Sequence, residues 1–278
     1  MTLTSRITQH YQLPGLLDRI HADMKRLGKT EETVTPDDLV NLDEYHFRGA
    51  AATQELIQLL SAGQGDNILD LGSGLGGPAR RLARSSGCKV TAIDLTEEYT
   101  NTSTVINRWF GQSDQIQCVT GDITNLSGFD NASFDGAWSI HVGMNIENKT
   151  KFYSEVYRVL KPGAKFIIYD VLKTADDAVI TYPAPWASSA DESFLVTESE
   201  LISLLEAASF EIEQNIDHTP ETVEFIKARV QPLAQAATPP PLSLATVIGP
   251  VFKDAFKNIV TAIHSGNVRL STTLCRKP

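Results

Sequence analysis

"NILDLGSGLGGPAR", residues 67–80, joins a short apolar run to an acid and then to a cluster of glycines. Glycine has no Cβ atom, so such a cluster lets the backbone turn sharply and approach a ligand closely. Gly72, Gly74 and Gly77 match the G-x-G-x-x-G spacing of loops that bind dinucleotides. However, the carboxylate of Asp70, two residues earlier, would repel a pyrophosphate and attract an ammonium group. The stretch therefore predicts a cofactor loop and leaves two classes open, NAD and another adenosine-containing cofactor.

Short apolar runs alternate with helical patterns from about residue 68 onward. The runs read "NILDL", "KVTAID", "IQCVTGD", "FDGAWSI" and "AKFIIYDVL". Nearly continuous apolar runs of this length are typical of strands that are buried on both faces of a parallel sheet. Alternating β and α units predict an α/β fold, an open sheet with helices on both faces.

Two segments fall outside this alternation and are predicted to be helical caps. Residues 1–55 are interpreted as an N-terminal helical lid. Residues 218–267 are interpreted as a helical cap inserted before the last strand, and residues 56–217 together with 268–278 as the cofactor-binding core.

Charge and composition limit the partners. The chain has 278 residues, a net charge of -10 and three cysteines. Nucleic acids and anionic membranes attract cationic surfaces, so neither is expected as a partner. The N-terminus lacks the apolar core of a secretory signal, and no apolar run is long enough to cross a membrane. We therefore expect a cytoplasmic monomer or homodimer that acts on a small molecule, and no metal site, because the cysteines and histidines are dispersed.

Further acids follow the next two strands. Asp94 ends "VTAID", about 20 residues beyond the glycine loop, where a carboxylate accepts hydrogen bonds from ribose hydroxyls. Asp122 and Ile123 follow "VTG", a position suited to an adenine amino group. NAD enzymes share the ribose acid, so Asp94 alone does not choose between the two cofactors.

The motifs together resemble class I S-adenosylmethionine-dependent methyltransferases over roughly residues 40–215. The resemblance is carried by "ILDLGSGLGG", "VTAIDLTEEY", "GDITNL", "SFDGAWS" and "RVLKPGAKFIIYD", in the order of that family. It implies a Rossmann-like, mostly parallel seven-stranded sheet, with S-adenosyl-L-methionine as cofactor and S-adenosyl-L-homocysteine as product. The cofactor-binding residues that it implies are Asp70, Gly72, Ser73, Gly74, Asp94, Leu95, Asp122, Ile123 and Ser139.

The segment "LVNLDEYHFRGAAATQEL", residues 39–56, is similar to a D-Q-F-H-x-x-G segment of small-molecule methyltransferases. These are the sarcosine/dimethylglycine, phosphoethanolamine-type and natural-product sugar enzymes, in which the segment closes over the cofactor. The resemblance implies lid and substrate roles, although core packing also explains the two aromatic side chains Tyr45 and His46. The substrate candidates are Tyr11, Tyr45, His46, Arg48, Met144, Asn145 and Trp186.

The catalytic candidates are His141, after "WSI", and Asp170, at the end of "FIIYD". A histidine titrates near neutral pH and suits a general base, and a carboxylate suits the steering of an amine or a sugar hydroxyl. Each also has a purely structural explanation, a buried histidine or a turn-capping acid. Because a neutral amine needs positioning more than a base, we expect N-methylation of a small polar amine. The alternatives are O- or C-methylation of a natural product with His141 as base, and a cofactor-binding protein without turnover.

Overall fold

The computed structural model describes residues 14–230, 240–249 and 252–278. Its seven-stranded sheet has the order β3-β2-β1-β4-β5-β7-β6. Strands β1 to β5 pair in parallel, whereas β7 is antiparallel to both β5 and β6. The open, mostly parallel seven-stranded sheet predicted from the sequence is confirmed. The strands are β1 (Asn67–Leu71), β2 (Lys89–Asp94), β3 (Ile116–Thr120), β4 (Phe134–Ile140), β5 (Leu160–Lys173), β6 (Glu211–Asp217) and β7 (Val268–Arg276).

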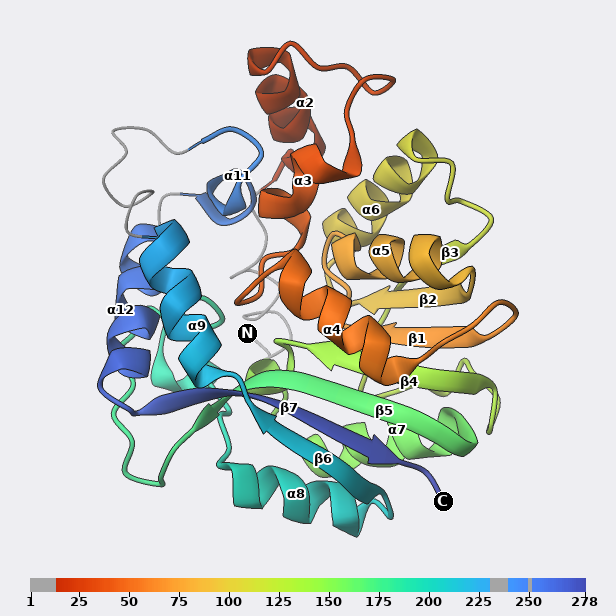
Figure 1. The fold of residues 1–278 in the computed structure, drawn as a ribbon, viewed down its shortest axis with the longest axis vertical. Coiled ribbons are helices and arrows are strands. Elements are labelled where there is room, and N and C mark those ends of the chain that lie inside the picture. The colour runs from red at the N-terminus through yellow and green to blue at the C-terminus, as the bar shows by residue number, and fades with distance from the viewer. Residues whose placement is uncertain (1–13, 231–239, 250–251) are drawn as a thin grey trace.

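Helices cover both faces of the sheet (Figure 1). The helices that follow the strands are α5 (Gly77–Ser86), α6 (Glu97–Trp109), α7 (Lys149–Val159) and α8 (Glu198–Ala207). The N-terminal helices are α2 (Leu16–Arg26), α3 (Pro36–Asp43) and α4 (Ala50–Leu60). The remaining turns and helices are η1 (Gly143–Asn145), η2 (Ala190–Glu192), α9 (Thr219–Phe225), η3 (Ile226–Val230), α11 (Leu244–Ile248) and α12 (Phe252–His264).

The two faces of the sheet carry separate apolar cores. Successive side chains of a strand point to opposite faces. Thus Trp138 of β4 packs in a cluster with side chains of α4, α5 and α12, while its neighbour Ala137 packs in a cluster with side chains of α7 and α8. Both residues are fully buried. This burial on both faces explains why the strands read as continuous apolar runs.

A third apolar cluster joins the N-terminal helices to the core. Leu16, Ile20 and Met24 of α2 are buried against side chains of α3, α6 and α11. Leu27, which directly follows the end of α2 at Arg26, is 44% exposed. The cluster places α2 and α3 beside α6, at the edge of the sheet where the glycine loop lies (Figure 1).

The segment between β6 and β7 contains α9, η3, α11 and α12. Helices α9 and α12 contact each other and β7. The sequence pattern from Ile248 to Ile263 suggests one helix, but the structure divides it, since α11 ends at Ile248 and α12 begins at Phe252. Gly249 follows α11 with a φ of 71°, a positive value that glycine adopts far more readily than other residues, and the helix ends there.

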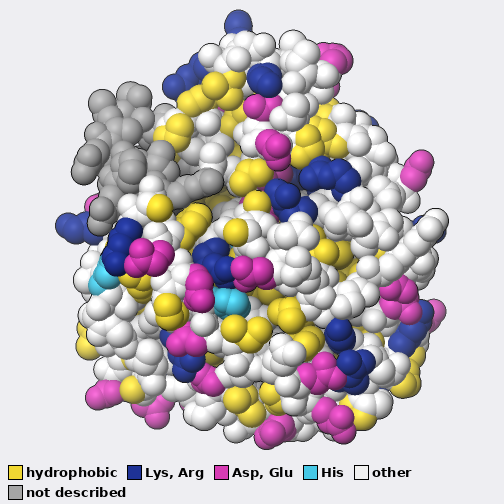
Figure 2. Space-filling model, viewed as in Figure 1, with side chains coloured by type: hydrophobic (Ala, Val, Ile, Leu, Met, Phe, Trp, Pro, Cys, Tyr) yellow, Lys and Arg dark blue, Asp and Glu magenta, His cyan; other side chains and the backbone are white. Residues whose placement is uncertain are grey.

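Figure 2 shows acidic and basic side chains interspersed on the face that it draws, outside the grey residues. Several acidic and basic side chains form ion pairs, such as Arg269 with Glu198 and Asp217. Within the described ranges, no helix combines the length and the apolar character that crossing a membrane requires.

Candidate active site

The glycine loop between β1 and α5 is hydrogen-bonded to β2. The backbone N–H groups of Gly72 and Ser73 both donate to the carbonyl oxygen of Ile93, at 2.8 and 2.9 Å. Gly72 has a φ of 78°, and a Cβ atom there would lie 2.9 Å from Cγ1 of Val142. The loop therefore needs glycine at this position, because it packs directly against the segment that follows β4.

Asp94, at the end of β2, is held by the same loop. Its Oδ2 atom accepts a hydrogen bond from the N–H of Gly74, and its Oδ1 atom accepts one from the N–H of Thr96, both at 2.8 Å. Burial raises the pKa of this carboxyl above its usual value. Each carboxylate oxygen can accept more than one hydrogen bond, so the fixed group can still receive donors from a ligand.

Asp70, near the end of β1, has an unsatisfied carboxylate oxygen. The residue is 2% exposed, and its Oδ2 atom has no hydrogen-bond partner among the described residues. Burial raises the pKa of the Asp70 carboxyl to about 7. A cationic group beside it would stabilise its ionised form.

A cavity lies at this edge of the sheet and is lined by both sets of residues. The expected cofactor residues that line it are Asp70, Gly72, Ser73, Gly74, Asp94, Leu95, Asp122 and Ile123. The expected substrate or catalytic residues that line it are Tyr45, His46, His141 and Asn145. The remaining lining residues are Asp43, Leu75, Pro78, Thr96, Tyr99, Gly121, Ile140, Val142 and Ile146. Residues from the N-terminal segment and from the ends of β1, β2, β3 and β4 thus meet around one space.

Asp170 is a candidate that the structure places elsewhere. It is 4% exposed and lies outside the cavity lining. Its carboxylate accepts hydrogen bonds from the backbone N–H groups of Val171 and Gly143. Burial raises the pKa of Asp170 to about 7, and the neighbouring Lys149 ammonium opposes that increase. This carboxylate therefore supports the turn after β4 and is not part of the cavity wall.

Three other expected substrate residues have partners away from the cavity. Arg48 forms an ion pair with Glu55 and donates to Nδ1 of His218 at 3.0 Å. The indole of Trp186 is buried and donates to the hydroxyl of Ser193 at 2.9 Å. Met144 is buried, and its carbonyl accepts from the N–H of Phe194.

Two of the site residues expected from the sequence remain to be placed. Ser139, an expected cofactor residue, is buried without lining the cavity, and its hydroxyl has no partner among the described residues. Tyr11 lies outside the described residues.

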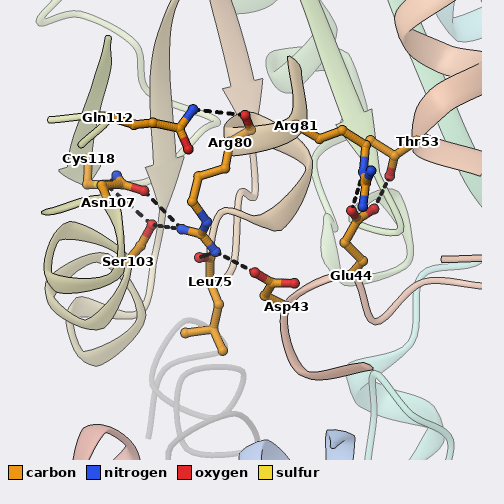
Figure 3. A network of polar contacts seen from close by, with 10 residues as sticks. All are labelled: Asp43, Glu44, Thr53, Leu75, Arg80, Arg81, Ser103, Asn107, Gln112 and Cys118. Atoms are coloured by element: carbon orange, nitrogen blue, oxygen red, sulfur yellow. Dashed lines mark hydrogen bonds and ion pairs between the residues drawn. The ribbon is translucent and has the colours of Figure 1, made fainter. Parts of the chain in front are cut away.

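A buried polar network that the motifs did not reveal joins the N-terminal segment to α5 (Figure 3). The guanidinium of Arg80 donates to Oδ2 of Asp43 at 2.6 Å and to Oδ1 of Asn107 at 2.9 Å. Beside it, the guanidinium of Arg81 donates to Oε1 of Glu44 at 2.6 Å. Asp43 lines the cavity, and burial raises the pKa of its carboxyl to about 6. The network thus fixes the segment that carries Tyr45 and His46.

Two histidines lie next to each other on the cavity wall. The ring centroids of His46 and His141 are 5.9 Å apart, and the His141 ring is 5.0 Å from that of Tyr169. Burial lowers the pKa of His46 and lowers the pKa of His141 well below the usual value. Both imidazoles are therefore uncharged at neutral pH and each has a nitrogen lone pair.

His141 itself has an unusual backbone. Its φ of 54° is rare for a residue other than glycine, and its N–H donates to the carbonyl of Tyr169 at 2.7 Å. Strained positions of this kind are concentrated at functional sites. Among the described residues, no cluster of histidine, cysteine and acidic side chains is arranged to hold a metal ion.

Comparison with known proteins identifies a domain. Residues 69–168 match the family described as "Methyltransferase domain". The sterol 24-C-methyltransferase of Eremothecium gossypii is 37% identical over 110 residues, which are 40% of this chain and 29% of that protein. The chain spans between 29% and 34% of the length of the first four curated relatives that it matches. The predicted resemblance is thus confirmed for this domain.

Solved structures confirm the fold. The geranyl diphosphate C-methyltransferase from Streptomyces coelicolor A3(2) has a TM-score of 0.73 and 16% identity, covering 100% of this chain and 99% of that one. A putative sarcosine dimethylglycine methyltransferase from Galdieria sulphuraria has a TM-score of 0.62 and 20% identity, covering 82% of this chain and 83% of that one. At these identities the likeness concerns the fold.

Proposed function

We propose that this chain, with a methyltransferase domain at residues 69–168, transfers a methyl group from S-adenosylmethionine to a carbon atom of an uncharged small molecule. One observation carries the proposal. One cavity is lined both by the acids Asp70, Asp94 and Asp122 and by the two uncharged imidazoles of His46 and His141. The acids suit a cationic cofactor with hydroxyl groups, and the imidazoles suit the removal of a proton.

The residues present fit this cofactor. The unsatisfied Oδ2 atom of buried Asp70 suits an ammonium group, and the fixed carboxylate of Asp94 suits the two ribose hydroxyls. Asp122 and Ile123 at the same cavity suit an adenine ring and its amino group. When bound, the cofactor supplies an electrophilic methyl group on a sulfonium.

The charges around the cavity favour an uncharged acceptor. No lysine or arginine occurs among the described residues that line it. The nearby Arg80 is engaged by Asp43, and Arg48 by Glu55. A phosphate or carboxylate on the acceptor would thus lack a cationic partner in the described wall and would face aspartates instead.

The first four curated sequence relatives, all C-methyltransferases by name, favour carbon over nitrogen as the acceptor atom, whereas the similar solved structures include enzymes of both kinds. The sterol enzyme and the geranyl diphosphate enzyme are both C-methyltransferases by name. Methylation of an alkene carbon leaves a positive charge on the acceptor, which is lost when a neighbouring C–H gives up its proton. The cavity has two imidazoles that can take this proton, whereas a neutral amine does not need a committed base. The alternative that includes C- and O-methylation is therefore preferred to the initial expectation of N-methylation.

Two measurements test this proposal. Titration calorimetry should detect binding of S-adenosylhomocysteine and none of NAD. Tritiated S-adenosylmethionine is then incubated with four probes, a sterol with a side-chain double bond, geraniol, a simple phenol and sarcosine. We expect label in a carbon-methylated product identified by mass spectrometry. A methyl ether would reassign the acceptor atom to oxygen and labelled dimethylglycine to nitrogen, and cofactor binding without any turnover would favour the binding-protein alternative.

A further inference from the structure

The tautomer of His46 follows from its two hydrogen bonds. Its Nε2 atom lies 3.0 Å from the carbonyl oxygen of Gly49 and 3.1 Å from the hydroxyl oxygen of Thr53. A carbonyl oxygen can only accept, so Nε2 carries the hydrogen. In the uncharged ring the lone pair is then on Nδ1, for which the described residues provide no hydrogen-bond partner. Because His46 lines the cavity, this nitrogen is the candidate acceptor of a proton.

A buried carboxylate supports the same imidazole. The Thr53 hydroxyl donates to Oε2 of Glu44, which leaves the hydroxyl oxygen free to accept from Nε2 of His46. Figure 3 shows Glu44 between Arg81 and Thr53, with the Arg81 ion pair on its other oxygen. Glu44 is 5% exposed and Thr53 is fully buried. The chain of contacts from carboxylate through hydroxyl to imidazole resembles the way in which catalytic histidines are oriented in other enzymes.

The neighbouring His141 lacks such support. Its Nε2 atom is buried and has no hydrogen-bond partner among the described residues. Its ring packs against the rings of Phe47 and Tyr169. The proximity of His46 also lowers the pKa of His141, so the two rings are not both protonated at once. A proton that reaches this pair is therefore better stabilised on His46.

We infer that Nδ1 of His46 is the proton acceptor of the proposed methylation, with Thr53 and Glu44 as its positioning residues. This inference rests on the proposed function and adds the residue that removes the proton. The π electron pair of the acceptor's double bond forms a bond between the acceptor carbon and the methyl group while the bond from that methyl to sulfur breaks, which leaves the positive charge on the neighbouring carbon. The neighbouring C–H bond of the acceptor then supplies the electron pair of the new double bond, and its proton passes to Nδ1 of His46. The products are the methylated alkene, S-adenosylhomocysteine and a proton that His46 later releases to water.

The groups that face His46 determine the sign of the pH dependence. Burial lowers the pKa of His46, and so do the cations Arg48 and Arg81, whereas Glu44 and the hydrogen bond to the Gly49 carbonyl raise it. The ring of His141 and the edge of Tyr169 also face it. The balance is a pKa below 6.5, so His46 is uncharged and able to accept a proton throughout the neutral range. Replacing Glu44 by glutamine removes the anionic group that raises the pKa of His46 and should lower this pKa further.

Nitrogen NMR of histidine-labelled protein with S-adenosylhomocysteine tests this arrangement without an acceptor. We expect the His46 ring to be in the Nε2–H form, assigned by its loss in His46→Gln. The titration midpoint of His46 should fall in Glu44→Gln and stay near the wild-type value in Thr53→Ser. An Nδ1–H form of His46 in the wild-type protein would overturn the inference.

Turnover with the same four probes gives the second test. His46→Gln should lose at least about 100-fold in kcat while its affinity for S-adenosylhomocysteine changes by less than about threefold. Thr53→Val should lower kcat about tenfold, and Thr53→Ser, which restores the hydroxyl, should recover most of it. If wild-type turnover occurs and His46→Gln retains it, the inference fails and the proposed function stands. If no probe is methylated, the proposed function fails, and the NMR result still decides the state of His46.

Discussion

The carbonyl group of Asp43 lies where a side chain on Gly77 would have to be. A Cβ atom on Gly77 would approach the carbonyl carbon of Asp43 to 2.7 Å, a distance that real Cβ atoms do not show. Asp43 is the last residue of α3, and Gly77 is the first residue of α5. Gly77, the last glycine of the G-x-G-x-x-G spacing, is therefore required by the contact between α3 and α5.

Replacement of Gly77 by alanine should separate α3 from α5. Neither backbone is free to move away, because Arg80 and Asp43 are paired in the buried network beside the contact. We expect a loss of about 1–3 kcal/mol in the free energy of unfolding, the usual cost of overpacking, measured by urea denaturation. Gly128→Ala is the matched control, since a Cβ atom there meets nothing within 4 Å. Equal stability of the two variants would contradict this explanation of Gly77.

Asp94 should contribute strongly to cofactor affinity. Asp94→Ala removes the acceptor proposed for the ribose hydroxyls and leaves the N–H groups of Gly74 and Thr96 without their partner. The affinity for S-adenosylhomocysteine should fall about ten- to a hundredfold in titration calorimetry. Asp177→Ala, an exposed acid on the segment after β5, serves as the control and should bind normally. An unchanged affinity in Asp94→Ala would remove this residue from the proposed cofactor site.

Patterns within short stretches of sequence predicted those parts of the candidate site that are formed by residues close together in the chain. The strand runs, the glycine loop, and the acids Asp94 and Asp122 all follow from the rule that ligands bind at the carboxyl ends of parallel strands. The pairing of Arg80 with Asp43 joins residues 37 positions apart, and no periodicity encodes such a partner. Asp170 is expected from the sequence at the end of a strand, but β5 continues to Lys173, and the turn after β4 and Lys149 lie against the carboxylate, so its burial could not be read from the strand pattern.

Lys149 should be essential for the turn that carries His141 and Asn145. Its ammonium group donates to the carbonyl oxygens of Gly143, Ile146 and Phe194, at 2.8, 2.7 and 2.6 Å. Lys149→Met leaves these acceptors unpaired and removes the cation near Asp170, so we expect a loss of at least about 3 kcal/mol in the free energy of unfolding.

The double variant Lys149→Met with Asp170→Asn should lose less stability than the sum of the single variants, because the asparagine no longer requires a cation. Urea denaturation of the four proteins measures this difference. Lys151→Met, on the exposed face of α7, is the control and should stay within about 0.5 kcal/mol of the wild type. Strict additivity would show that the two buried charges do not interact.

We expect the carboxyl group of Asp70 to release a proton when the cofactor binds. Burial raises the pKa of its carboxyl from 3.8 to about 7 in the free protein. The unfolded chain therefore loses this proton at a lower pH than the folded protein does, so the residue lowers stability as the pH rises from about 4 to 7.

An ammonium group beside Asp70 would bring its pKa down again and expel the proton near pH 7. Calorimetric titrations of S-adenosylhomocysteine in buffers with different ionisation enthalpies should detect this release, together with tighter binding as the pH rises through 7. Asp70→Asn should bind without it, and proton uptake by the wild-type protein would contradict the proposed contact.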